Sequence, residues 1–131
     1  MTDLRELAPI TVELFVPDVD ASARFYTENL GFELLRLERE GERATFAVVA
    51  LGRALMLIAH DGLAASVGLS KGSGEGLSVR VIVDDVDAVY ARARERGLTI
   101  VADIGDRYYG LRDFSLQDGD GFHMRFASPR R

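Results

Sequence analysis

The sequence predicts an α+β fold built from two tandem βαβββ modules, and three observations support this prediction. Residues 12–21 recur 67 positions later as residues 79–88, and six of the ten aligned positions are identical. Each copy is an alternating, β-branched run that leads through aspartates into a stretch with helical spacing. Short apolar runs bounded by glycine follow both copies. Such a repeat indicates a duplicated supersecondary unit.

The first module is expected to continue from its leading strand into a helix. One apolar face of this helix consists of Ala21, Phe25, Tyr26 and Leu30. Gly31 follows the last apolar position and is the expected left-handed C-cap. At the other end, either Asp18 or Asp20 can accept hydrogen bonds from the free amides of the first turn. Strands are then expected over residues 32–40, 43–51 and 53–59, separated by Gly41 and Gly52.

The second module repeats this order. Its helix has an apolar face of Val86, Val89, Tyr90 and Ala93, with Asp85 or Asp87 as N-cap and Gly97 as C-cap. Strands are expected over residues 98–102, 110–117 and 121–127, the last two joined by a hairpin turn over residues 118–121. We therefore predict one domain over residues 1–131, with module 1 over about residues 8–60, a linker over 61–76 and module 2 over 77–128. The Gly- and Ser-rich residues 68–76 are typical of a mobile linker or lid.

The composition excludes several functional classes. With 131 residues, 47% of them hydrophobic, the chain can bury one core without covalent cross-links. The absence of cysteine excludes disulfide bonds, thiolate nucleophiles and cysteine-ligated metals. A formal net charge of −5, with one basic cluster at Arg130 and Arg131, predicts that no nucleic acid is bound. The charged start of the chain, and the interruption of its longest apolar region by Gly52 and Arg53, predict a cytoplasmic protein with no membrane partner.

Three motifs together resemble a known family. They are FYTENLGFEL at residues 25–34, VDDVDA at residues 83–88 and the DGDG turn at residues 118–121. The chain resembles the vicinal oxygen chelate superfamily, which includes glyoxalase I, extradiol dioxygenases, fosfomycin-resistance enzymes and bleomycin-resistance proteins. The resemblance covers nearly the whole chain. It implies the glyoxalase/bleomycin-resistance fold, in which each module forms a half-barrel sheet with its helix on the convex side, and it also implies a homodimer.

Side-chain alternation along the strands predicts which residues face the concave, ligand-binding side. On the leading strands these are Thr11, Glu13 and Phe15 in module 1 and Ser78, Arg80 and Ile82 in module 2. On the closing strands they are Met56 in module 1 and His123 and Arg125 in module 2, where Phe122, Met124 and Phe126 pack inward instead. Tyr109, at a loop-to-strand junction, is either a stacking partner for the ligand or an ordinary packing residue.

The resemblance also implies where a metal would bind. Metal-dependent members of the superfamily place ligands at four positions, which correspond here to Thr11, Met56, Ser78 and Arg125. Two hydroxyls, a thioether and a permanently charged guanidinium are poor ligands for a divalent cation. We therefore expect no metal and no cofactor. An EF-hand is also excluded, because the twelfth position counted from Asp118 is Pro129 and not glutamate.

Three further positions are open to a structural or a functional interpretation: Glu13, Arg80 and His123. Glu13 and its repeat mate Arg80 form either a buried structural ion pair or part of the ligand site. His123 is either a hydrogen-bonded wall residue or an acid or base. His60, before Asp61 and Gly62, is expected to be a solvated turn residue.

Three functional classes agree with these observations. The first is a small-molecule-binding protein of the bleomycin-resistance type, which sequesters an organic ligand, such as an antibiotic, in a dimeric cavity without metal. The second is an enzyme, a glyoxalase- or dioxygenase-like lyase or oxidoreductase that is metal-free or uses an unorthodox metal site, with Glu13 and His123 as candidates. The third is a sensor or scaffold with a vestigial pocket. We favour the first, and the net negative charge gives a weak indication of a cationic ligand.

Overall fold

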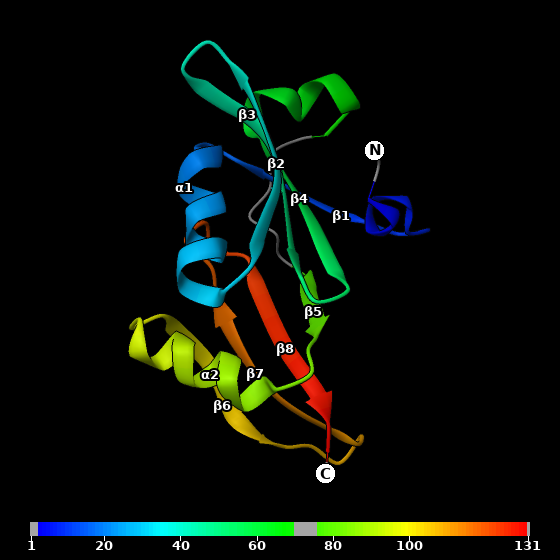
Figure 1. The fold of residues 1–131 in the computed structure, drawn as a ribbon, viewed down its shortest axis with the longest axis vertical. Coiled ribbons are helices and arrows are strands. Elements are labelled where there is room, and N and C mark those ends of the chain that lie inside the picture. Colours follow the sequence, from blue (N-terminus) through cyan, green and yellow to red (C-terminus); the bar gives the residue numbers. More distant parts are fainter. Residues whose placement is uncertain (1–2, 70–75, 131) are drawn as a thin grey trace. The chain divides into compact units, whose positions relative to one another are not determined.

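The computed structural model describes residues 3–69 and 76–130, which divide into two compact units (Figure 1). Unit 1 is Met1–Gly72 and unit 2 is Ser73–Arg131, so the division falls within the predicted linker. Residues 70–75, the centre of that linker, lie outside the described residues. The part of the linker that is described contains two short 3-10 helices, Asp61–Leu63 and Ala65–Val67, which the sequence did not predict.

Unit 1 contains a four-stranded sheet and a helix. After a 3-10 helix over Leu4–Leu7, the elements are β1 (Val12–Val16), α1 (Val19–Arg24), β2 (Glu33–Glu40), β3 (Arg43–Leu51) and β4 (Ala54–His60). The strand order is β1-β4-β3-β2, with β1 parallel to β4 and the other neighbours antiparallel.

Unit 2 repeats this topology. Its elements are β5 (Ser78–Ile82), α2 (Val86–Glu95), β6 (Thr99–Asp106), β7 (Leu111–Gln117) and β8 (His123–Pro129), with strand order β5-β8-β7-β6. Again the leading strand is parallel to the closing strand and the other pairs are antiparallel. The predicted α+β fold of two tandem βαβββ modules is therefore confirmed.

In each unit the helix covers one face of the sheet, and the core lies between them (Figure 1). In unit 1 the ring of Tyr26 is fully buried and packs edge-to-face on Phe32, with 5.2 Å between centroids. In unit 2 Phe114 stacks on Phe126 at 5.6 Å, and Tyr90 from α2 packs edge-to-face on Phe114 at 5.1 Å. We call the sheet face opposite α1 in unit 1, and opposite α2 in unit 2, the open face.

The helix N-caps are Asp18 and Asp85, not Asp20 and Asp87. Each capping carboxylate accepts a hydrogen bond from the backbone N–H three residues on, at 3.0 Å in α1 and 3.1 Å in α2. In α1 the predicted apolar face is wrong at Ala21, which is exposed, whereas Val19, Ser22 and Ala23 are the buried residues of this helix. The helix then continues as a π-helical turn, Phe25–Asn29, which no sequence pattern indicated.

Strand boundaries follow the predictions closely except in β6. This strand was expected to end at Ala102 but extends to Asp106, with irregular pairing to β7 along its second half. The hairpin turn between β7 and β8 has the predicted position. The carboxylate of buried Asp118 accepts hydrogen bonds from the backbone N–H groups of Asp120 and Phe122, both at 2.9 Å. Over the described parts of the chain, we find no helix with the length and apolar character needed to cross a bilayer.

Candidate functional site

The open face of unit 1 carries three of the predicted site residues. Along β1, Leu14 and Val16 are buried, whereas Glu13 is exposed and Phe15 is half-buried. This alternation places Glu13 and Phe15 on the open face, and Thr11, directly before β1, is also exposed.

Met56 does not lie on this face, and the prediction for it is wrong by one residue. Its side chain is 1% exposed and it pairs with Val12, so that it lies on the same side as Leu14 and Ile58, toward the helix. Glu13 pairs with Leu57, as Arg80 pairs with Arg125 in the other unit. The repeat mate of Arg125 is therefore Leu57.

The open face of unit 2 is the more polar of the two. Ser78, Arg80 and Ile82 of β5 are exposed, and they pair in register with His123, Arg125 and Ala127 of β8. On the other side of β8, Ser115 pairs with Arg125 and Asp113 pairs with Ala127. Since paired residues share a face, the side chains of Ser115 and Asp113 lie on the open face with Arg125.

These residues border a pocket of about 410 Å³ within unit 2. It is lined by Ala102, Asp103, Ile104, Arg107, Tyr109, Asp113, Ser115, His123 and Arg125. Three of the predicted site residues, Tyr109, His123 and Arg125, are brought together here. Two further polar lining residues, Arg107 and Asp113, were not predicted from the sequence.

Asp113 is the buried centre of a polar network in this pocket. One carboxylate oxygen accepts from Arg107 Nε at 2.7 Å and the other accepts from the Tyr109 hydroxyl at 2.5 Å. Burial raises the pKa of Asp113, but these two hydrogen bonds and the charges of Arg107 and Arg125 outweigh it, so the pKa lies below the usual value. The same contact with Asp113 raises the pKa of Tyr109 and of Arg107. Asp113 is therefore an ionised acceptor whose two oxygens are both engaged.

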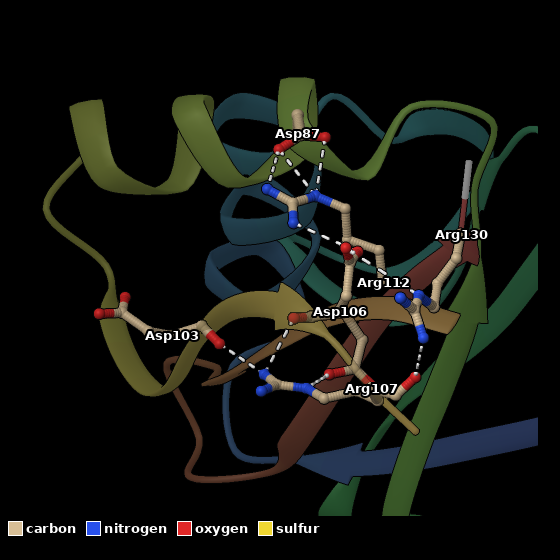
Figure 2. Close-up of polar contacts among 7 residues, drawn as sticks. Asp87, Asp103, Asp106, Arg107, Arg112 and Arg130 are labelled. Carbon is tan, nitrogen blue, oxygen red and sulfur yellow. Dashed lines mark hydrogen bonds and ion pairs between the residues drawn. The ribbon is translucent and has the colours of Figure 1, made fainter. Parts of the chain in front are cut away.

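Arg107 ties the loop after β6 to its surroundings. Its guanidinium donates to the backbone carbonyls of Asp103 at 2.5 Å and Asp113 at 3.1 Å. In Figure 2 the carboxylate of Asp103 points away from Arg107, and Arg130 reaches the backbone carbonyl of Arg107 from the other side, at 3.2 Å. These contacts hold the loop that carries Tyr109, which supports Tyr109 as an oriented pocket residue.

His123 is fixed by a neighbour from the leading strand. The Ser78 hydroxyl and His123 Nδ1 are 2.6 Å apart, which is a short hydrogen bond between register partners. Nε2 is then the ring nitrogen that remains for another partner.

A separate ion-pair cluster lies on the other side of the same sheet. Arg112 of β7 binds Asp87 of α2 at 2.9 Å and Asp106 of β6 at 3.4 Å, as Figure 2 shows. Adjacent residues in a strand point to opposite faces, so Arg112 faces the helix whereas Asp113 faces the pocket. A second hollow of about 330 Å³ lies beside this cluster, at the start of α2. Its cationic residue, Arg112, is neutralised by these carboxylates.

Glu13 and Arg80 belong to different units, and both residues are exposed. Exposure differs from the burial that the ion-pair interpretation assumed, and the pairing itself stays a prediction. His60, predicted to be a turn residue, ends β4 and is half-buried. Its Nδ1 accepts from the backbone N–H of Gly62 at 3.1 Å, and this contact closes the following turn.

The residues at the four family metal positions do not fit a divalent cation. With Leu57 in place of Met56, the set is Thr11, Leu57, Ser78 and Arg125, which provides two hydroxyls, an alkyl group and a cation. Within residues 3–69 and 76–130, no three His, Asp or Glu side chains gather closely enough to hold a metal ion.

The duplicated βαβββ topology and the two open sheet faces define the class of protein. The model of the Glyoxalase/Bleomycin resistance protein/Dioxygenase superfamily matches residues 8–126, and the chain belongs to this superfamily. No curated protein matches the sequence.

Solved structures agree on the fold. TioX from Micromonospora sp. ML1 is 24% identical with a TM-score of 0.76, and the alignment covers 95% of this chain and 98% of that one. A glyoxalase-related enzyme from Fulvimarina pelagi is 20% identical with a TM-score of 0.71, covering 92% and 88%. A glyoxalase/bleomycin resistance protein/dioxygenase from Nocardioides is 20% identical with a TM-score of 0.67, covering 96% and 89%. At these identities the likeness concerns the fold alone.

Proposed function

We propose that this chain binds a small organic molecule on its open sheet faces and sequesters it without a metal, in a cavity that a second copy of the chain completes. The observation that carries the proposal is the pocket of unit 2, where Tyr109, Asp113, Ser115, His123 and Arg125 converge from a loop and two strands. A few convergent polar groups on a sheet face are the usual form of a small-molecule site.

The composition of the family metal positions favours binding over metal-assisted chemistry. None of Thr11, Leu57, Ser78 and Arg125 supplies a carboxylate or imidazole, so a metal-bound water or substrate oxygen would lack ordinary protein ligands. An antibiotic is one class of ligand that this kind of site accommodates in the bleomycin-resistance proteins, and we include it among the candidates.

One observation favours a metal-free enzyme as the second candidate. The hydrogen bond between Ser78 and His123 orients the ring of His123, which lines the pocket. An oriented imidazole is the group most often used for proton transfer. In that case the His123→Gln variant would bind ligand but lose turnover, whereas a pure binding protein would show no turnover to lose.

Native mass spectrometry of the protein as isolated tests the proposal. We expect a co-purified organic ligand or, after ligand screening, a complex of one ligand per pocket, with no stoichiometric metal. Treatment with EDTA should leave the melting temperature unchanged, since a metal bound only to the folded state would add stability. A fall of several degrees, restored by one specific ion, would refute metal-free binding, and failure to bind any compound of a broad library would favour a vestigial pocket.

A further inference from the structure

Two arginines occupy neighbouring positions on the open face of unit 2. Arg80 of β5 and Arg125 of β8 are register partners in the parallel pair, and parallel partners present their side chains on the same face. Like charges directly opposite each other in a sheet are unfavourable. On its other flank Arg125 pairs with Ser115, which brings no negative charge. The sheet therefore concentrates positive charge at this point.

Arg125 also has an unsatisfied donor. Its Nε is buried and finds no hydrogen-bond partner within the described portion of the chain. A buried donor without an acceptor is costly, and the cost is larger for a charged group. Such a group calls for an explanation, and an acceptor from outside the protein, such as water, an ion or a ligand, supplies one.

The neighbouring carboxylates do not supply this acceptor. The oxygens of Asp113 accept from Arg107 and Tyr109, and the charge of Asp113 acts on Arg125 without a hydrogen bond to its Nε. Asp103 also lines the pocket, but one of its carboxylate oxygens accepts from the Tyr90 hydroxyl at 2.6 Å. On the strand face itself, the side chains next to Arg125 are Arg80 and Ser115 on the paired strands and His123 and Ala127 along β8.

His123 adds a further polar contact on the same side. Because its Nδ1 is held by Ser78, Nε2 is the nitrogen that remains for a ligand beside Arg125. Arg125 and His123 both line the pocket, so a single ligand group can reach both side chains.

We propose that the ligand bound on this face carries an organic oxyanion, a carboxylate or sulfonate, whose oxygens accept hydrogen bonds from Arg125 with Arg80 adding favourable charge. The planar guanidinium matches the geometry of such groups and binds them through paired N–H donors. This inference rests on the proposed binding function and names its ligand class. It reverses the weak indication of a cationic ligand drawn from the net charge of −5, because the local charge of the face opposes the charge of the whole chain.

A matched pair of fluorescent probes tests the inference on the full-length chain. Anilinonaphthalene sulfonate and its uncharged parent, N-phenylnaphthylamine, share one aromatic body and differ in the anionic group. We expect the sulfonate to bind at least about tenfold more tightly than the parent, the scale of one charge-assisted hydrogen bond. The preference should weaken as salt is added, since screening acts on the charged group alone.

Three variants assign the preference to these arginines. Arg125→Gln should reduce the preference for the sulfonate to about twofold or less, and Arg80→Gln should reduce it partly. Arg80 is exposed, so its variant keeps the test valid if Arg125→Gln disturbs folding. The matched control is Arg112→Gln on the opposite face, which removes the same charge and should leave the preference unchanged.

The outcomes separate the two proposals. Equal binding of both probes, or a preference that survives both Arg125→Gln and Arg80→Gln, overturns the oxyanion inference and leaves the binding function standing. If neither probe binds and no library compound does, the binding function fails and the inference fails with it.

Discussion

The carboxylate of Asp113 lies between two donors from one loop, and its substitution tests how much the pocket depends on that loop. Asp113 is 3% exposed and accepts from both Arg107 and Tyr109. In Asp113→Asn an NH2 group replaces one of the two accepting oxygens, so either Arg107 or Tyr109 loses its acceptor. Arg107 also loses its counter-ion. We expect a loss of about 1–3 kcal/mol in the free energy of unfolding, measured by urea denaturation. Asp84→Asn, at an exposed position in the same unit, is the control and should change little.

The wild type and Asp113→Asn should also differ in how their stability depends on pH. The pKa of Asp113 is lowered in the folded state from its ordinary value of 3.8. A lowered pKa means that the stabilising contribution is complete above 3.8 and is lost as the pH falls through the folded-state value. The stability difference between wild type and Asp113→Asn should therefore shrink as the pH is lowered below 3.8. A difference that stays constant across this range would show that the ionised carboxylate is not what stabilises the network.

For Glu13 and Arg80, unlike Asp113, we expect substitution to have little effect on stability. A buried pair would lose roughly 3–5 kcal/mol when one partner is truncated. Both residues are exposed, so Glu13→Gln and Arg80→Gln should each change the free energy of unfolding by less than about 0.5 kcal/mol. Thermal unfolding of the two variants and their double mutant would show any coupling. A loss above about 2 kcal/mol in either single variant would instead support the Glu13–Arg80 ion pair.

Part of the candidate site could be predicted from the alternation of side chains along strands, and the rest depends on the path of a loop. His123 and Arg125 follow from the alternation with buried Met124 and Phe126. The same reasoning applied to β7, where Phe114 and Leu116 are buried, would have placed Asp113 and Ser115 on the open face. Arg107 could not be found in this way. It lies outside the regular strands, and its contact with Asp113 depends on the path of the loop.

At the scale of elements, the N-caps were ambiguous in the sequence and the structure decides between the candidates. Asp85 caps α2 through Ala88, whereas Asp87 lies in the first turn and pairs with Arg112. Asp85→Ala should lower the free energy of unfolding by about 0.5–2 kcal/mol, the usual value of an N-cap. Asp87→Ala removes an exposed ion pair and should lower it by less than about 1 kcal/mol. Circular dichroism followed during denaturation compares the two, and a larger loss in Asp87→Ala would contradict the assignment.

Strand positions were easier to predict than strand faces. Glycines and turn residues mark the ends of β3 and β7, so their extents agree with the expected ranges to within a residue. In β4 every residue from Ala54 to Ala59 is apolar, and a run without alternation does not reveal its buried face. Pairing with β1 sets that face, and a shift of one residue exchanges Met56 for Leu57. In β6 the sequence Asp103, Ile104, Gly105, Asp106 is typical of a loop, and the pairing with β7 shifts register before Gly105.

At the scale of the whole molecule, the two units share one topology but carry different charges at equivalent positions of their open faces. The open face of unit 1 presents Glu13 beside Leu57, whereas the equivalent positions of unit 2 present Arg80 beside Arg125. The two copies have thus kept their pairing register while diverging in charge at matched positions. Because register is fixed by the buried faces, the open faces are free to change, and the oxyanion site that we propose lies on the arginine-bearing one.

The last prediction concerns assembly. Several large apolar side chains remain exposed, including Leu77 at 51%, Ile82 at 43%, Val101 at 53% and Tyr108 at 96%. Exposed apolar side chains of this kind become favourable contacts when an interface covers them, and copies of one chain most often pair with twofold symmetry. We expect an isologous homodimer that buries more than about 1,000 Å² in total, as stable interfaces do. Sedimentation velocity should give twice the single-chain mass of 14.4 kDa, with dissociation only on strong dilution. A species of 14.4 kDa at every concentration would rule out the dimer.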